Sequence, residues 1–192
     1  MIKVSKCFGI WLFLCFSMIF LSCNQSSTYL DETKFEEMRG KCISVLPDSC
    51  SFRLDVPFAN CSLRVNVKNS EPSIDYYFFS YDTPANRDQL ADWIDEQGNP
   101  KHINSNAILL DVKSMDDVFS YIKALYEEQF NDYQSSSGGR YLSTQIKYND
   151  EYFFPIFFSC DIRRSSFGIN SPLSVVEPTR VTVKNFNYPE YF

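Results

Sequence analysis

The sequence is poor in histidine and has no cluster of positive charge. It contains one histidine, His102, and its 18 Lys plus Arg stand against 24 Asp plus Glu, a formal net charge of -6 at pH 7. One imidazole leaves few ways to build a histidine metal site or a histidine-dependent catalytic centre. Nucleic-acid binding rests on neutralising phosphates with Lys and Arg, so this composition argues against a nucleic-acid partner.

Several catalytic motifs are missing as well. Ser135 to Ser137 lack the G-x-S-x-G turn of many hydrolases. Asp111, Asp116 and Asp117 lack the D-x-D-x-D-G pattern of calcium loops, and helix capping accounts for the last two. No internal repeat or long linker divides the chain. We therefore expect no metal, no cofactor and a single domain over residues 31–192.

The first 22 residues have the pattern of a cleaved signal. Lys3 and Lys6 precede Cys7 to Leu21, an apolar run of 15 residues without a charge. A membrane-spanning helix needs about 20 apolar residues, whereas the apolar part of a secretory signal needs about 7 to 15. The run therefore favours a signal peptide over residues 1–22 and export of the remainder.

The end of this signal resembles the lipobox of bacterial lipoproteins, in which a small residue precedes a cysteine that receives diacylglycerol. Leu21-Ser22-Cys23 matches its last three positions, while Phe20 stands where an aliphatic residue is usual. The resemblance implies lipidation of Cys23 and a lipidated tether over residues 23–30. A plain secretory signal and an uncleaved anchor are the alternatives.

The lipoprotein resemblance also implies a location. The protein would be anchored in a bacterial cell envelope through acyl chains such as palmitate, with the domain facing the periplasm or the cell surface. Asn24, which follows the cysteine, slightly favours the outer membrane over the inner one.

Four cysteines remain once the signal and Cys23 are set aside. They are Cys42, Cys50, Cys61 and Cys160, an even number that predicts two disulfides in an oxidising compartment. We expect Cys42–Cys50 to close a short loop and Cys61–Cys160 to tie an early strand to a late one. Free buried thiols are the alternative; zinc is disfavoured because no C-x₂-C pair is present.

Apolar periodicity predicts the first elements of secondary structure. Asp31 to Lys41 has the spacing of a short helix, and Ser51–Val56 with Cys61–Val67 has that of a hairpin. Ser73–Tyr81 carries apolar residues on both faces, which predicts a central strand covered on both sides.

The second half of the chain is expected to alternate helices with strands. Thr83-Pro84 is a helix-start signal for a helix running to about Gln97, and Asn106–Val112 is a short apolar strand. Ser114 is expected to cap a helix over Met115–Phe130, whose apolar stripe is the clearest in the sequence. The remaining strands are Arg140–Tyr148, Tyr152–Ile162 and Thr179–Phe186, the first two forming a second hairpin.

This order predicts an α+β domain, in which a mainly antiparallel sheet of about six to seven strands carries two long helices and a short N-terminal helix. A faint resemblance to PsbP/Mog1-like domains rests on Phe52-Arg53-Leu54-Asp55-Val56-Pro57 opening a hairpin. It implies a similar fold and transfers no functional residue.

The remaining excess is aromatic, with 18 Phe, 12 Tyr and 2 Trp. Most of these residues fit buried strand positions, but the tail offers Tyr188, Tyr191 and Phe192 as candidate binding residues for a glycan or another envelope protein. We expect a non-catalytic binding or assembly component of the envelope. The alternatives are a surface lipoprotein that binds a glycan or small ligand, and a carboxylate-dependent envelope hydrolase.

Overall fold

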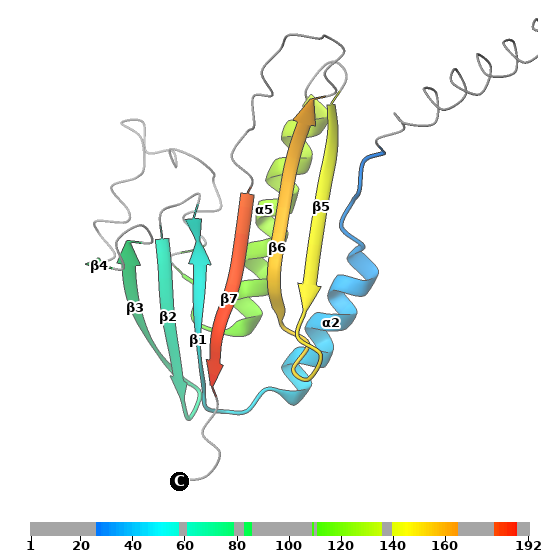
Figure 1. The fold of residues 1–192 in the computed structure, drawn as a ribbon. Helices are drawn as coiled ribbons and strands as arrows, with labels where there is room; N and C mark the ends of the chain where they lie inside the picture. Colours follow the sequence, from blue (N-terminus) through cyan, green and yellow to red (C-terminus); the bar gives the residue numbers. More distant parts are fainter. Residues whose placement is uncertain are drawn as a thin grey trace, which may run out of the picture.

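The computed structural model describes residues 26–57, 61–78, 83–85, 109, 111–135, 140–164 and 179–187. These residues form one antiparallel sheet of seven strands with two fully described α-helices (Figure 1). The helices are α2 (Glu32–Val45) and α5 (Met115–Ser135), and the strands are β1 (Cys50–Val56), β2 (Cys61–Lys68), β3 (Glu71–Phe78), β4 (Thr83–Ala85), β5 (Arg140–Tyr148), β6 (Pro155–Arg164) and β7 (Thr179–Asn187). The expected α+β class and antiparallel sheet are confirmed.

The strands lie across the sheet in the order β4-β3-β2-β1-β7-β6-β5. Both predicted hairpins, β1-β2 and β5-β6, and the predicted last strand, β7, are confirmed. β7 lies between β1 and β6, with Val183 opposite Leu54 and Val181 opposite Phe158. The last strand of the chain therefore joins the two hairpins into one sheet.

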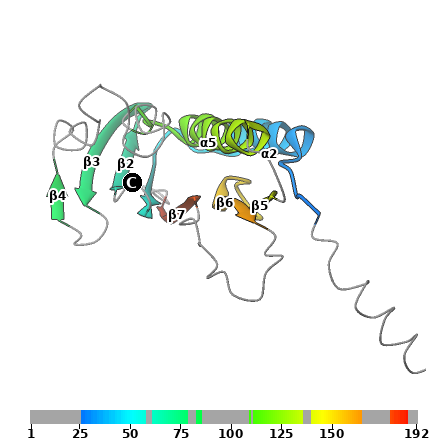
Figure 2. The same ribbon diagram turned by 90° about the horizontal axis from the view of Figure 1, so that it is seen from above.

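One face of this sheet packs against both helices, and Figure 2 shows α2 and α5 side by side on it. Strand alternation directs Phe52 and Leu54 of β1 toward the helices, where they are buried together with Ile122 of α5. Phe35 of α2 meets Phe119 of α5 edge to face, with ring centroids 5.3 Å apart. Burying each such side chain stabilises the folded state by about 1.5–3 kcal/mol. The hydrophobic core therefore lies between this face of the sheet and the helices.

Helix α2 begins where Asp31 supplies a cap. The Asp31 carboxylate accepts a hydrogen bond from the backbone N–H of Lys34 at 3.0 Å, which satisfies a donor that the first helical turn leaves open. The helix covers most of the segment Asp31 to Lys41 that we expected to be helical and continues to Val45.

Helix α5 begins after the predicted cap, Ser114. The Ser114 hydroxyl oxygen accepts from the backbone N–H of Asp117 at 3.2 Å, and the Asp117 carboxylate accepts from the Lys113 N–H at 2.9 Å. This reciprocal pattern resembles a capping box. The predicted helix over Met115–Phe130 is confirmed and extends to Ser135.

The prediction of a central, doubly covered strand at Ser73–Tyr81 is wrong. β3 lies second from the edge of the sheet, beside the three-residue β4, and none of its residues is fully buried. Its aromatic side chains, Tyr76, Tyr77 and Phe78, are only half-buried because the strand lies near the sheet edge, and a Tyr hydroxyl can also remain near water. An apolar pattern made of tyrosines is therefore weaker evidence for burial than one made of valines and leucines.

The predicted helix start at Thr83-Pro84 is also wrong. Residues Thr83–Ala85 form β4 and pair with β3, Pro84 lying opposite Tyr77. Proline has no backbone N–H to donate to a neighbouring strand. An edge strand tolerates proline because the outer side of that strand makes no ladder hydrogen bonds. The Thr-Pro signal is thus compatible with a short edge strand. Residues 86–97 lie outside the described residues.

The predicted strand at Asn106–Val112 is wrong over the part that is described. Leu109 is helical, and residues 111–114 are a turn and coil that lead into α5. Leu109 and Val112 are nevertheless buried in the core. A short apolar run predicts burial well, but periodicity alone cannot separate a buried strand from a buried helical turn.

The two predicted disulfides are absent, since all four cysteines are free and buried. Cys61 in β2 and Cys160 in β6 are separated by β1 and β7. Three strand spacings put these backbones about 14 Å apart, beyond the Cα separation of about 4.4–6.8 Å that a disulfide needs. Cys42 lies within α2, which ends at Val45, and residues 46–49 connect it to Cys50 at the start of β1, with both thiols free.

Part of the segment 23–30, which we expected to be a tether, is held by β5, and residues 23–25 lie outside the described residues. The backbone N–H of Thr28 donates to the Leu142 carbonyl at 2.8 Å, and Leu30 is only 7% exposed. Residues 27–30 therefore belong to the folded domain, because a buried leucine and ladder-like hydrogen bonds fix them against β5.

Candidate binding face

The second face of the sheet is polar and carries no described helix (Figure 2). We call it the helix-free face, and strand register assigns side chains to it by alternation. Its members from β1, β2 and β3 are Arg53, Asp55, Ser62, Arg64, Asp75 and Tyr77, and those from β6 and β7 are Phe157, Ser159, Asp161, Arg163, Arg180, Thr182 and Lys184. Charged side chains thus gather on one side of the sheet and the core on the other.

Asp55 is the centre of a buried polar cluster on this face. The residue is 2% exposed, and its Oδ1 accepts from Arg53 Nε at 2.7 Å and from Ser62 Oγ at 2.8 Å. Lys184 Nζ lies 2.9 Å from Oδ2. The register explains the meeting, because Ser62 is directly opposite Asp55 and Lys184 is opposite Arg53.

The partners of Asp55 control its charge. Burial raises the pKa of this carboxyl, but hydrogen bonds from Lys184, Arg53 and Ser62 favour the ionised form and together outweigh burial. The pKa of Asp55 is therefore lowered below its ordinary value. An aspartate held ionised by three donors is a structural anion at neutral pH and is poorly suited to be a general acid.

Three cations lie side by side on neighbouring strands of the helix-free face. Arg53 is directly opposite Arg64 on β2 and Lys184 on β7. Like charges placed opposite each other destabilise a sheet by about 0.2–1 kcal/mol per pair. Asp55 offsets part of this repulsion, and Arg64 lies over the ring of Tyr77 with its Cζ 4.7 Å from the centroid.

Asp161 is a second aspartate on this face, with a different environment. Its side chain is 12% exposed, Oδ1 has no hydrogen-bond partner among the described residues, and Oδ2 accepts from Arg163 at 3.5 Å. Burial raises the pKa of this carboxyl more than Arg163 and Arg180 lower it. The charged form of Asp161 is therefore disfavoured in the folded protein.

The candidate site residues chosen from the sequence do not form a site in the described part of the structure. Cys23, Tyr188, Tyr191 and Phe192 lie outside the described residues, as does His102.

The cysteines that we expected to form disulfides lie in the core. Burial raises the pKa of Cys42 and of Cys61 to about 12, and that of Cys160 to about 11. Burial also raises the pKa of Cys50. The thiolate is the nucleophilic form, so these thiols are chemically quiet near neutral pH.

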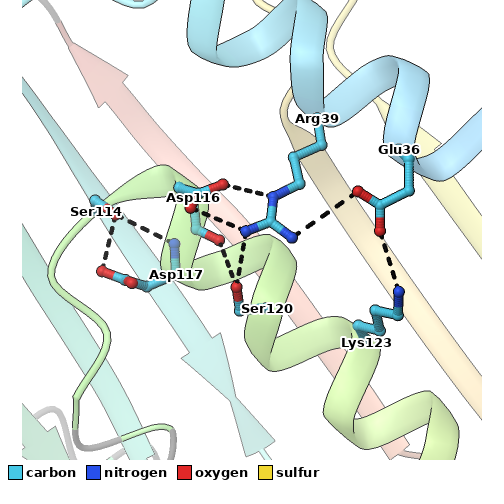
Figure 3. Close-up of polar contacts among 7 residues, drawn as sticks. All are labelled: Glu36, Arg39, Ser114, Asp116, Asp117, Ser120 and Lys123. Carbon is cyan, nitrogen blue, oxygen red and sulfur yellow. Dashed lines mark hydrogen bonds and ion pairs between the residues drawn. The ribbon is translucent and has the colours of Figure 1, made fainter.

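A polar network joins the two helices instead of forming a catalytic cluster (Figure 3). Arg39 of α2 donates from Nε to Asp116 Oδ1 at 2.5 Å and from Nη2 to Asp116 Oδ2 at 2.9 Å. Arg39 Nη2 also donates to Ser120 Oγ at 3.1 Å, and Lys123 Nζ donates to Glu36 at 3.2 Å. The acids in the first turn of α5 therefore have structural roles: Asp116 links α5 to α2 through Arg39, and Asp117 caps the start of α5.

Two kinds of feature are absent from the described ranges. No three His, Cys, Asp or Glu side chains there are grouped so that they could hold a metal ion. Neither α2 nor α5 has the length and apolar character needed to cross a membrane.

Comparisons with protein families, with curated proteins and with solved structures found no match to this chain. The helix-free face must therefore be interpreted from its own chemistry.

Sequence reasoning missed the residues that make up this face. Arg53 and Asp55 were within the predicted first strand, and alternation of Phe52, Leu54 and Val56 already placed them on its other side. Lys184 could not be assigned to the same cluster, because the pairing of β7 with β1 joins segments more than a hundred residues apart.

Proposed function

We propose that this chain is a lipoprotein of the bacterial cell envelope that binds an acidic partner through the helix-free face, without catalysis. The observation that carries the proposal is the position of the positive charge. Arg64, Arg180 and Lys184 are exposed on this face, although the chain has a formal net charge of -6. A local cationic surface on an acidic protein attracts anionic groups and orients them during encounter.

The absence of catalysis is proposed from the state of the reactive groups. Asp55 is held ionised by its donors, and burial raises the pKa of each of the four described cysteines. Neither kind of group has a pKa near neutrality, where general acid–base work is most efficient. Asp55 and these cysteines are therefore poorly suited to proton transfer or nucleophilic attack near neutral pH, which favours a role in recognition.

The acidic partner would be an anionic envelope protein or an anionic glycan. Arginine is suited to both, because its planar guanidinium binds carboxylates in a bidentate manner and also stacks on rings. Arg64 beside Tyr77 combines a cation with an aromatic surface, an arrangement that sugar rings and acidic side chains can both contact.

Lipidation is tested by replacing Cys23 with Ser and labelling growing cells with palmitate. We expect the parent chain to take up label and sediment with membranes, and the variant to lose both properties. Continued labelling and membrane retention of the variant would refute the lipoprotein assignment.

Binding is tested with fluorescent polyglutamate as the anionic probe at low salt. The variant Arg64→Gln/Arg180→Gln removes two exposed cations that do not bond to Asp55, and Lys34→Gln/Lys113→Gln makes the same charge change away from the face. We expect the first variant to bind about tenfold more weakly and the second to bind nearly as the parent does. Equal losses in the two variants would refute the assignment of the face.

A further inference from the structure

The segment that leads to Cys23 is held firmly along the outer edge of β5. Thr28 forms a parallel bridge with Ser143, and the backbone N–H of Thr144 donates to the Thr28 carbonyl at 3.1 Å. The Leu142 N–H donates to Ser27 Oγ at 3.1 Å, and Ser27 Oγ lies 3.1 Å from the hydroxyl of Tyr133 in α5. These contacts fix the path of the chain from Ser27 onwards.

The direction of this segment shows at which end of the sheet the chain enters the domain. Because Thr28 runs parallel to β5, Ser27 and Ser26 continue from it toward the end where β5 begins, at Arg140 (Figure 1). Antiparallel pairing places Arg164 of β6 and Thr179 of β7 at the same end. We call this the entry end; the β5-β6 turn around Asp150 lies at the opposite end.

The covalent chain limits how far a lipid on Cys23 can lie from the entry end. Four residue steps separate Cys23 from Ser27, and a fully extended chain covers at most about 3.3–3.6 Å per step, about 14 Å in all. This reach is shorter than β5, whose nine residues span about 30 Å at about 3.3 Å per residue. Ser27 bonds at the level of Leu142, and the far end of β5 at Tyr148 lies about 20 Å further along the strand at about 3.3 Å per residue. The far end is therefore out of reach of the lipid anchor, and the entry end with the adjoining edge of β5 lies nearest to it.

The entry end also carries basic residues. Arg140 is the first residue of β5, and Arg163 of β6 pairs with Tyr141 beside it. The Arg163 side chain is 54% exposed, and its contact with Asp161 is long, at 3.5 Å. Arginine binds phosphate oxygens well, and basic residues near a bilayer are attracted to anionic lipid.

We propose that the entry end of the sheet faces the bilayer, with Arg140 and Arg163 at the phosphate groups of the lipids, while the β5-β6 turn points away from the membrane. This inference rests on the lipidation of Cys23 under the proposed function. It leaves the helix-free face standing beside the bilayer, where a partner on the same membrane reaches it.

The orientation is tested with fluorophores at two single positions of the lipidated, full-length mature protein. Tyr141→Cys labels the entry end, and Asp150→Cys labels the far turn of the same hairpin. The four native thiols are buried and Cys23 is blocked by lipid, so the introduced thiol takes the label. The protein is reconstituted in vesicles of equal parts phosphatidylcholine and phosphatidylglycerol that carry a headgroup quencher.

We expect the label at position 141 to lose most of its fluorescence on reconstitution, and the label at position 150 to keep most of its own. Equal quenching, or stronger quenching at position 150, would overturn the orientation. Intact mass and vesicle flotation measured on the same samples report lipidation separately. A chain without acyl groups that does not float would contradict the proposed function, whatever the quenching.

Two variants of the position-141 sample test the limit on chain reach and the contact with phosphate groups separately. A Gly-Ser spacer inserted between Cys23 and Ser26 keeps the lipid but removes the limit on reach, so it should reduce the quenching. Arg140→Gln/Arg163→Gln should reduce the quenching in the mixed vesicles and have little effect in pure phosphatidylcholine, whereas Lys34→Gln/Lys113→Gln should have little effect in either. Unchanged quenching in the spacer variant would overturn the argument from chain length, and unchanged quenching in the arginine variant would overturn the contact with phosphate groups.

Discussion

Asp55 and Asp161 lie on the same face of the sheet, and their carboxyl groups have opposite pKa shifts for reasons that are visible in their contacts. Both are desolvated by burial, which disfavours the charged form. Asp55 gains three hydrogen-bond donors in return, whereas Asp161 has one oxygen without a partner among the described residues and a long contact to Arg163. The number and closeness of donors, more than burial, decide the sign of each shift.

These opposite shifts predict opposite effects of the same substitution. The pKa of Asp55 is lowered by folding, so its contribution to stability is present above an unfolded pKa of about 3.9 and is lost as the pH falls through the lower folded pKa. Asp55→Asn should therefore cost about 1–3 kcal/mol at neutral pH and progressively less in acid. Urea unfolding at a series of pH values measures this.

The pKa of Asp161 is raised by folding, so its ionised form costs stability at neutral pH, and that cost disappears as the pH falls below the unfolded pKa of about 3.9. Asp161→Asn should therefore stabilise the protein by about 1 kcal/mol at neutral pH and have little effect in acid. The same urea series provides the comparison, and substitutions that change stability with the same sign at neutral pH would contradict the account of this face.

At the scale of elements, the contact between α2 and α5 combines apolar burial with one bidentate ion pair. Phe35 and Phe119 give the helices an apolar contact, and Arg39 with Asp116 fixes their relative position along the interface. The pair is partly exposed, with 24% of the Arg39 side chain and 43% of the Asp116 side chain accessible. Solvent therefore weakens the attraction, although the bidentate geometry is favourable.

A double-mutant cycle measures the coupling free energy between Arg39 and Asp116. Arg39→Ala, Asp116→Ala and the double variant should give a coupling free energy of about 0.5–1 kcal/mol in thermal or urea unfolding. The exposed pair Lys41 and Glu37 within α2 is the matched control, and its coupling should be about 0.3 kcal/mol. A coupling for Arg39 and Asp116 no larger than that of the control would show that the apolar contact alone positions the helices.

At the scale of the whole molecule, the four buried cysteines report on one cooperative core. Cys42 is in α2, Cys50 begins β1, Cys61 begins β2 and Cys160 lies in β6. These elements come from both hairpins and from the helical layer. The two hairpins belong to one sheet because β7 pairs with β1 on one side and with β6 on the other. Reagents reach all four thiols only when the core opens.

Thiol labelling of the purified protein tests this cooperativity. In native buffer we expect Cys42, Cys61 and Cys160 to react slowly and at one common rate, because burial raises their pKa values to about 12, 12 and 11. After denaturation without reductant, all four should react at once. A Glu151→Cys variant, which adds a thiol in an exposed turn, should show one fast site as a control. Disulfides that hide two or four thiols in the denatured protein would contradict the free state.

Features that depend on residues close together in the chain were the easiest to predict from the sequence. The two hairpins and helix α5 were predictable because alternation, turn residues and the Ser114 cap act within a few residues. The strand expected at Asn106–Val112 and the helix expected from Thr83 failed because their signals fit more than one local structure. The Cys61–Cys160 pairing failed because it depends on the order of strands across the sheet, which no local pattern encodes.

The sequence by itself determined the apolar and polar faces of β1, β2, β5, β6 and β7 and the cap of α5 at Ser114. Only the tertiary structure decided that β7 lies beside β1, and this pairing brings Lys184 to Asp55 and separates Cys61 from Cys160 by two strands. It also decided that residues 27–30 lie along β5, which leaves a short link to Cys23. The physical reason is that side-chain alternation is a property of each strand, whereas the choice of neighbours depends on how the whole chain buries its core.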